Sequence, residues 1–455
     1  MFLGLFTPAR ALSPALAAHP PGLPAVFPDP DCSGLFNAPR CRLFDHRRFN
    51  TRRDRDAVVP LVCPETGAVL AFWGRIDNRD SLLQALEPGP GLSAASTDAA
   101  LVLAGWRHWG EALPQHLVGD FALAVFDPAR QGLFLARDPL GVKPLYLTWQ
   151  RDVLAFGNSV SALRTLPGLT LTPDPDWMAR YLIGHSKHPE NTAYREVRKV
   201  PPGHALWCSA DTPVRQWRYH EWRDDAPWSR QRDPAWVDAY REVLEESIRC
   251  RMDSEYPLGT ENSGGIDSAT VTAYLARFLG TPGDRLHSFG FALCEQEPAY
   301  ILETSQACQI THNYLITARD PSDAAGQRIK RSLAILGYPE EHGNGSGHVR
   351  FYEESRQRGI RTLFSGFGGD EVVTNPGHLL RYELIDRRAY RGLWNILPGH
   401  PVKRSLRLGK ALTVGRRSPV YRSAFLAAWN QRWPHQPLKP EVVERLNLHH
   451  EYMET

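Results

Sequence analysis

Residues 263–268 read Ser-Gly-Gly-Ile-Asp-Ser, which places a hydroxyl at each end of a glycine-containing loop and a carboxylate within it. A short apolar stretch precedes this loop, and a helical pattern over residues 268–278 follows it. A loop between a strand and a helix presents free backbone N–H groups to an anion, and adjacent glycines let the backbone approach a phosphate closely. Ser263 and Ser268 can donate to phosphate oxygens, and Asp267 can bind Mg²⁺, which prefers oxygen ligands. The stretch therefore predicts a phosphate-binding loop rather than an ordinary turn, although it lacks the Gly-Lys-Ser/Thr ending of a Walker A motif.

A second glycine-rich stretch, residues 365–371, reads Ser-Gly-Phe-Gly-Gly-Asp-Glu and directly follows a predicted strand over residues 361–364. The adjacent carboxylates of Asp370 and Glu371 would repel each other unless a cation lay between them and Asp267. Mg²⁺ bound to ATP phosphates is the simplest such cation. Alone, the stretch is equally compatible with a turn. Paired with the first stretch, it predicts a nucleotide site.

From Leu258 onward, strands alternate with helices, which is typical of a parallel sheet. Ligands of such sheets bind at the carboxyl ends of the strands, where both glycine-rich stretches fall. The expected strands cover residues 286–291, 313–316 and 361–364, and the expected helices cover 268–278, 299–308, 320–336 and 349–358. Another helix opens at Asp233-Pro234, and its apolar residues at helical spacing are interpreted as core: Trp236, Tyr240, Val243, Leu244 and Ile248.

Residues 1–210 are rich in pairs of strands with helices set apart, which predicts an α+β layered domain. Strands are expected over residues 2–6, 58–62, 68–73, 121–126, 133–136, 145–149 and 153–156, and helices over 79–86 and 98–109. A linker rich in Trp, Pro and charge covers residues 211–232. The ATP-site region covers 233–380, and residues 381–455 are predicted to form a helical basic extension.

The composition, with a formal net charge of +3 and 23% charged residues, is that of an ordinary soluble globular protein. This charge is too small to indicate a nucleic-acid partner, and no apolar run reaches the roughly 18 residues of a membrane helix. Seven cysteines without C-x-x-C spacing indicate reduced thiols in a cytoplasmic protein. The basic residues from Arg381 to Arg422 are interpreted as a solvated helical surface, with a groove for a polyanionic or peptide substrate as the alternative.

Taken together, the two glycine-rich stretches resemble those of the asparagine synthetase superfamily, whose ATP-pyrophosphatase domain carries S-G-G-x-D-S and S-G-x-G-x-D-E loops. The first domain resembles a class II glutamine amidotransferase. Its matching stretches are Gly74-Arg75-Ile76-Asp77-Asn78, Asp98, Gly119-Asp120-Phe121-Ala122 and the run Ala-Arg-Asp-Pro-Leu-Gly-Val-Lys-Pro-Leu-Tyr at residues 136–146. The resemblance implies an α+β sandwich of the Ntn (class II amidotransferase) type, with four layers. It also implies that an α/β Rossmann-like ATP-pyrophosphatase domain with a helical C-terminal part follows.

The resemblance implies the chemistry as well. A carboxylate attacks the α-phosphate of Mg-ATP to give an acyl-adenylate and pyrophosphate, and an amine then forms the amide. Carried over by motif, Asp267 and Asp370 bind Mg²⁺ and form the catalytic group with Glu371. The residues implied to bind ATP and pyrophosphate are Asn262, Ser263, Gly264, Gly265, Asp267, Ser268, Phe289, Ser365 and Gly366, with Asn262 and Phe289 contributing backbone.

Three features depart from the family pattern. Glutamine-hydrolysing members begin Met-Cys and use that cysteine as nucleophile, whereas this chain has Phe2, and it has Trp73-Gly74-Arg75 in place of the Asn-Gly-Glu turn that grips glutamine. We therefore expect no amidotransferase nucleophile and no glutaminase activity. Asparagine synthetases place a glutamate where this chain has Phe367. The family's catalytic lysine lies in a region beyond the last residues here, which suggests a truncated or incomplete chain, and the best stand-ins are Lys403 and Lys410.

The first two departures favour a branch of the superfamily that uses an amine already present in its substrate, as lasso-peptide cyclases and β-lactam synthetases do. The Gly-Gly-Asp-Glu form of the second stretch is most similar to lasso-peptide cyclases, which join an Asp or Glu side chain of a precursor peptide to its N-terminal amine as a macrolactam. A peptide or amino-acid carboxylate is then the substrate, and a precursor peptide and its processing protease are the expected partners. Two alternatives stay open: an asparagine synthetase that uses ammonia, and a non-catalytic homologue.

Overall fold

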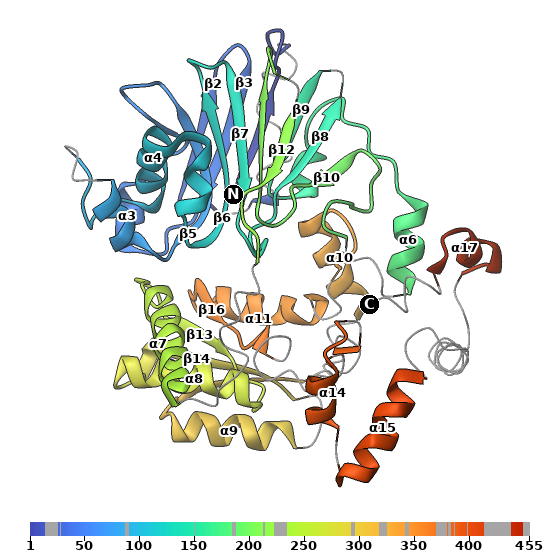
Figure 1. The fold of residues 1–455 in the computed structure, drawn as a ribbon. Coiled ribbons are helices and arrows are strands. Elements are labelled where there is room, and N and C mark those ends of the chain that lie inside the picture. Colours follow the sequence, from blue (N-terminus) through green and yellow to red (C-terminus); the bar gives the residue numbers. More distant parts are fainter. Residues whose placement is uncertain are drawn as a thin grey trace. The chain divides into compact units, whose positions relative to one another are not determined.

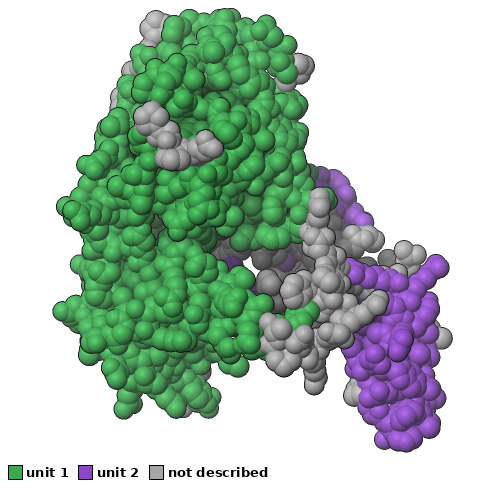
Figure 2. Space-filling model, turned by 60° about the vertical axis from the view of Figure 1, so that its left-hand side comes forward, with its two compact units in different colours: residues 1–178, 186–365 green, residues 179–185, 366–455 purple. Residues whose placement is uncertain are grey.

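A computed structural model describes most of the chain. The described residues are 1–13, 26–27, 29–86, 91–150, 152–183, 188–212, 214–222, 234–292, 296–317, 325–341, 345–369, 380, 384–385, 387–397, 399–413 and 438–448. The chain forms two compact units: residues 1–178 with 186–365, and residues 179–185 with 366–455 (Figure 2). The first unit holds both the α+β domain and the parallel sheet.

Two antiparallel six-stranded sheets build the first domain (Figure 1). The first sheet has the order β10-β8-β9-β1-β3-β2 and consists of β1 (Phe2–Phe6), β2 (Cys32–Asn37), β3 (Cys41–Arg47), β8 (Tyr146–Gln150), β9 (Val153–Gly157) and β10 (Val197–Lys199). The second has the order β12-β11-β7-β6-β5-β4 and consists of β4 (Leu61–Val62), β5 (Val69–Ile76), β6 (Gly119–Asp127), β7 (Gly132–Arg137), β11 (His204–Ser209) and β12 (Arg215–Arg218).

The two sheets face each other across an apolar core and carry helices on their outer faces. Phe6 and Leu43 of the first sheet pack with Ala124 of the second inside the sandwich. The outer face of the second sheet packs against α3 (Arg79–Ala85) and α4 (Asp98–Trp109), which continues into the 3₁₀ helix η2 (Gly110–His116). The outer face of the first packs against α5 (Val160–Leu163) and α6 (Pro175–Leu182). This helix–sheet–sheet–helix order confirms the expected four-layer α+β sandwich.

The second half of the first unit is a parallel sheet with the order β15-β14-β13-β16, as the alternating pattern predicts. Its strands are β13 (Leu258–Glu261), β14 (Leu286–Ala292), β15 (His312–Thr317) and β16 (Thr362–Phe364). Its helices are α7 (Pro234–Arg251), α8 (Ile266–Leu279), α9 (Glu297–Ala307), α10 (Ala325–Leu336) and α11 (Gly345–Gln357), with short 3₁₀ helices η1 (Arg52–Asp56) and η4 (Gly283–Arg285) elsewhere in the unit.

Each face of the parallel sheet has its own apolar cluster. Leu258 and Leu286 point to one face and pack with Leu275 of α8. Phe289 points to the opposite face and packs with Phe351 of α11. Burial on both faces confirms the predicted α/β Rossmann-like architecture.

The interpretation of the α7 stripe as core is wrong for its middle part. Ile248 is 4% exposed and packs in the cluster with α8, and Leu244 lies against that cluster. Tyr240 and Val243, however, are 50% and 67% exposed among the residues that the structure describes. Helical spacing identified one face of α7 correctly, but only the C-terminal part of that face meets the sheet.

The described residues of the second unit are helical. They form α14 (Tyr390–Ile396), α15 (Pro401–Thr413) and α17 (Pro440–Arg445), and no strand occurs among the described residues from 366 to 448. Leu393 of α14 is fully buried, and Val443 of α17 packs with Ile183. The six cysteines that the structure describes are free thiols. No helix within the described ranges combines the length and apolar composition that crossing a membrane requires.

Leu123 tests the packing between the second sheet and α4. Its side chain is fully buried, whereas the Leu140 side chain is 69% exposed. We expect Leu123→Ala to lower the free energy of unfolding by about 2–5 kcal/mol, because it removes buried methyl groups and leaves a cavity. Leu140→Ala is the control and should change it by less than about 0.5 kcal/mol. Equal effects of the two substitutions in denaturant unfolding would contradict the described core.

Candidate functional site

The Ser263 stretch forms a loop between the carboxyl end of β13 and the first turn of α8. Its own side chains brace it. The Ser263 N–H donates to Ser268 Oγ at 3.1 Å, and the two serine hydroxyls lie 2.9 Å apart. The Gly264 N–H donates to Asn262 Oδ1 at 3.0 Å. These internal hydrogen bonds fix the shape of the loop.

The first turn of α8 is open to an anion. The residue before the helix is Gly265, which has no side chain with which to accept from the first N–H groups. Helix N-termini leave such N–H groups unsatisfied and carry partial positive charge. Ser268 is buried and its hydroxyl also donates to Gly265 O at 3.1 Å, so it acts as a brace of the loop in addition to any phosphate contact. The backbone N–H groups and Ser263 are donors that suit a phosphate.

Asn262 joins the loop to the strand and helix beside it. Its side chain is 1% exposed, and its Nδ2 donates to the Ile301 carbonyl on α9 at 3.2 Å. Its backbone N–H donates to the Phe289 carbonyl at 2.7 Å. The Phe289 side chain is fully buried, so any nucleotide contact at this position would have to come from backbone. The predicted nucleotide roles of Asn262 and Phe289 stay predictions.

Gly264 occupies a position that only glycine fits without strain. Its φ is +76°, and a Cβ built there would lie 2.5 Å from Cβ of Tyr300 on α9. Gly265 has an ordinary φ of −79°, and a Cβ there would meet only Ser263 Oγ at 3.3 Å. The first glycine is therefore required by the fold of the loop, and the second leaves the surface open above the helix N-terminus.

The second stretch starts beside the first. Ser365 directly follows β16, which pairs with β13, and Ser365 Oγ donates to Glu261 Oε2 at 2.6 Å. Glu261 is the last residue of β13, and no motif in the sequence singled it out. The available signal was a carboxylate at the end of an otherwise uncharged strand, directly before the phosphate loop. Burial raises the pKa of the nearby Tyr352 phenol, and the Glu261 carboxylate raises it further.

The predicted metal ligands are only partly visible. Asp267 lies half-buried in the first turn of α8, on the loop side of the parallel sheet. Asp370 and Glu371 lie outside the described residues, so their convergence with Asp267 stays a prediction. Gly366 and Phe367 belong to the second compact unit, and Phe367 is 72% exposed. In the described part of the chain, no three metal-binding side chains gather into a centre of their own.

In the first domain, the residues at the positions of the nucleophile and of the glutamine-binding turn of glutamine-hydrolysing relatives contact other residues of this chain. The Phe2 side chain is fully buried, and its ring lies edge-on to Phe156 with centroids 6.4 Å apart. Asp98 accepts from the Ile76 N–H at 2.9 Å and also pairs with Arg79. Arg75 Nε donates to Asp77 at 2.7 Å. These side chains make contacts with other residues of the chain.

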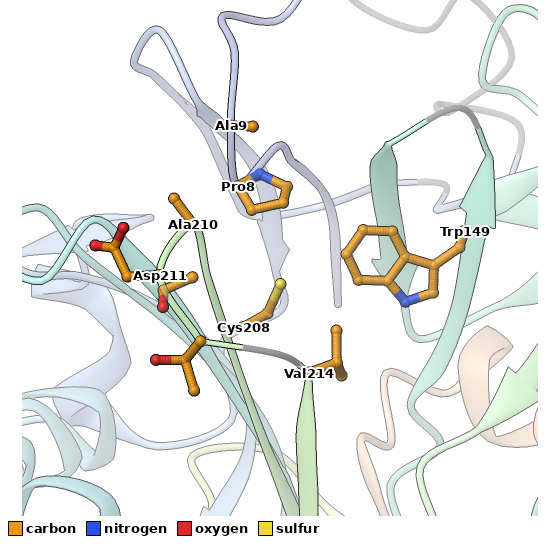
Figure 3. Close-up of a pocket in the computed structure, with 9 residues that line it drawn as sticks. Pro8, Ala9, Trp149, Cys208, Ala210, Asp211 and Val214 are labelled. Carbon is orange, nitrogen blue, oxygen red and sulfur yellow. The ribbon is translucent and has the colours of Figure 1, made fainter.

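A cavity of about 370 Å³ lies elsewhere in the first domain (Figure 3). Pro8, Trp149, Cys208 and Val214 are among its lining residues, and none of them belongs to either glycine-rich stretch. Burial raises the pKa of the Cys208 thiol to about 11, so the thiol is protonated at neutral pH. A protonated thiol is a poor nucleophile, and we assign no chemistry to this cavity.

Comparison with known proteins agrees with this two-part structure. Residues 29–220 match the model of a glutamine amidotransferase domain, and residues 239–452 match that of asparagine synthase. The chain belongs to the asparagine synthetase superfamily. These two ranges correspond to the antiparallel sandwich and to the parallel sheet with the helices that follow it.

Several curated relatives carry asparagine synthetase or amidase names. Asparagine synthetase [glutamine-hydrolyzing] 3 of Bacillus subtilis is 28% identical over 54% of this chain and 40% of its own length. Amidase chry2 of Gibberella zeae is 26% identical over 61% of this chain and 42% of its own. A putative asparagine synthetase [glutamine-hydrolyzing] of Mycobacterium tuberculosis is 28% identical over 77% and 53%. The chain thus spans about half the length of these relatives.

The two adjacent glycines of the loop provide a matched test of its geometry. Gly264→Ala should lower the free energy of unfolding by about 1–3 kcal/mol, because a Cβ is strained at positive φ and collides with Tyr300. Gly265→Ala should change it by less than about 0.5 kcal/mol. Denaturant unfolding of both variants measures the difference. If Gly264→Ala is as stable as Gly265→Ala, the described loop is incorrect.

Proposed function

We propose that this chain is an ATP-dependent ligase that adenylates a side-chain carboxylate and couples it to an amine. The observation that supports this most is the braced Ser-Gly-Gly-Ile-Asp-Ser loop at the open N-terminus of α8, beside Ser365 on the neighbouring strand. Its shape and donors fit the phosphates of a nucleotide. Membership of the superfamily supports the same reaction class.

The Ser263 loop and the two aspartates would have different roles in adenylation. The loop N–H groups and Ser263 would hold the β- and γ-phosphates, and Asp267 with Asp370 would hold Mg²⁺. The metal ion, when bound, offsets the negative charge of the phosphates. The substrate carboxylate attacks the α-phosphorus, the bond to the bridging oxygen breaks, and pyrophosphate leaves with the negative charge that the loop donors stabilise. An amine then attacks the acyl carbon, loses a proton and displaces AMP.

We propose that the amine is part of the same substrate, so that the product is a macrolactam of a peptide. Phe2 is buried where glutamine-hydrolysing relatives have their cysteine, and Phe367 stands where asparagine synthetases have a glutamate. Without a thiol nucleophile, the first domain would release no ammonia from glutamine. Binding the two ends of one peptide together supplies the orientation that a bimolecular coupling lacks. The substrate would then be a precursor peptide, and its processing protease a partner in the cytoplasm.

An asparagine synthetase that uses free ammonia is the second candidate. Several relatives carry the name asparagine synthetase, which supports the acyl substrate of this candidate, but those names specify glutamine hydrolysis rather than free ammonia. It requires the same adenylation site but a free aspartate as the acyl substrate. A non-catalytic homologue is the third candidate, and it would have no use for a braced phosphate loop.

Pyrophosphate release separates these candidates. With Mg-ATP and the peptide encoded by a neighbouring open reading frame, we expect release that free aspartate does not elicit, and a product lighter than the peptide by one water. Release with aspartate and ammonia would instead identify an asparagine synthetase. Absence of release with every substrate would favour the non-catalytic homologue.

The carboxylate of Asp267 is expected to be required. Asp267→Asn should lower pyrophosphate release by about a hundredfold or more, because the phosphates lose a charged metal ligand while the loop keeps its shape. Asp284→Asn is the matched control, since its carboxylate is 98% exposed at the amino end of β14. Full activity of Asp267→Asn would refute the metal assignment.

Glutamine should not serve as a nitrogen source. We expect no glutamate to form when the chain is incubated with glutamine, with or without Mg-ATP, since Phe2 offers no thiol. Glutamate production, measured with a coupled dehydrogenase, would show that another residue acts as the nucleophile and that the first domain hydrolyses glutamine.

A further inference from the structure

The C-terminal end of α7 inserts an arginine into the first domain. Arg251 Nη1 and Nη2 donate to the two carboxylate oxygens of Asp120 at 2.8 and 3.0 Å, and Nη2 also donates to Asp77 at 2.7 Å. Asp120 is 8% exposed, whereas the Arg251 side chain is 36% exposed, so the contact is partly buried. Although burial opposes the charged form, the hydrogen bonds with Asp120 raise the pKa of Arg251 above its usual value. The guanidinium is therefore held charged between two carboxylates.

Arg75 adds further hydrogen bonds to this contact. It stands directly opposite Asp120 in the register of β5 and β6, so the two side chains leave the same face of the sheet. Its guanidinium donates to the carbonyls of Cys250 and Arg251 as well as to Asp77. The last carbonyls of a helix have no partners within the helix and carry partial negative charge, so an arginine there stabilises the helix end. The first domain thus binds both the side chain and the backbone of the end of α7.

The segment between α7 and β13 continues the contact. Asp253 pairs with Arg53, and Glu255 pairs with Arg55 at 2.8 Å. The Glu255 N–H donates to the Asn50 carbonyl at 2.9 Å. This segment leads directly into β13, whose far end carries the phosphate loop.

The amino end of β16 is held in the same way. The Thr362 hydroxyl donates to Asn50 Oδ1 at 3.1 Å, the same oxygen that accepts from Ser254 at 2.9 Å. Arg361 pairs with Asp31, and this hydrogen bond lowers the pKa of Asp31. β13 and β16 are neighbours in the parallel sheet, and they lead to the two glycine-rich stretches.

We propose that the first domain serves as a clamp that fixes the positions of β13 and β16, and that Arg251 is its central positioning residue. The residues that bind Arg251 come from two of the stretches that match the amidotransferase family, Gly74–Asn78 and Gly119–Ala122. In this chain those stretches hold the synthetase-like sheet at its amino ends. The placement of the Ser263 loop at the end of β13, and of Ser365 at the end of β16, then depends on the first domain. The proposal rests on the function proposed above only for its effect on catalysis.

Arg251→Met tests the clamp in the full-length chain, with Arg241→Met as the control. Arg241 lies on the same helix and, within the part of the chain that the structure describes, forms an ion pair with the exposed Asp238 three residues away. We expect Arg251→Met to speed hydrogen exchange of the amides in residues 258–268 by about tenfold or more, and Arg241→Met to leave it unchanged. Unchanged exchange in Arg251→Met would overturn the clamp whatever reaction the protein catalyses.

The KM for ATP is a second measurement, and a loss of folded protein alone would not change it. Arg251→Met should raise the KM for ATP in pyrophosphate release by about tenfold, because the Ser263 loop loses its alignment. Arg251→Lys keeps the positive charge and should raise this KM by a smaller factor. A smaller kcat at unchanged KM would indicate only a loss of folded protein and would count against positioning. If the wild-type chain releases no pyrophosphate, the proposed function fails, and hydrogen exchange still decides the clamp.

A double-mutant cycle with Asp120→Asn keeps the test valid if Arg251→Met folds poorly. Arg251→Lys and Asp120→Asn, which retain most of the side-chain volume, should each speed exchange at residues 258–268. The effect of the double variant on the exchange free energy should be clearly less than the sum of the two single effects, because both substitutions remove the same contact between Arg251 and Asp120. Additive effects would show that the two residues act independently and would overturn the proposed contact.

Discussion

The candidate site depends on the hydrogen bonds of the buried residue Asn262. It joins the end of β13 to β14 and α9, and its Oδ1 turns the next residues back so that Gly264 can adopt a positive φ. A loop held this way presents its N–H groups without first having to become ordered, so little conformational entropy is lost when an anion binds. The proposed nucleotide site thus depends on a residue that is itself almost inaccessible to solvent.

The two ends of β13 contact different parts of the molecule. At the carboxyl end, the strand leads into the Ser263 loop and places Glu261 next to Ser365. At the amino end, α7 and the segment after it are fastened to the first domain by Arg251 and Glu255. A parallel strand is rigid over such a short length, so a displacement at one end moves the other. This connects the amidotransferase-like sandwich, which lacks a cysteine at position 2, with the geometry of the site.

The sequence predicted those features that have a local or periodic signature. The position of the Ser263 loop between a strand and a helix was predictable because its glycines, hydroxyls and carboxylate occur together, and α4 and β1 were predictable from the regular spacing of their apolar residues. β3 (Cys41–Arg47) was missed because Arg42 and Asp45 interrupt its pattern, although both are buried and Arg42 finds Asn37 as a partner. The contact of Arg251 with Asp120 spans 131 positions and has no period, so only the folded chain reveals it. The middle of α7 was mispredicted because periodicity identifies a face but not what covers it.

The central claim is that Asp267 and Asp370 meet at one divalent cation beside the phosphates of ATP. The most direct measurement is the crystal structure of the full chain with Mn²⁺ and a non-hydrolysable ATP analogue, with the metal located by its anomalous scattering. The account predicts an anomalous peak within coordination distance of both carboxylates, with the analogue's phosphates on the N-terminus of α8. A metal bound to neither aspartate, or an analogue bound away from the Ser263 loop, would contradict it.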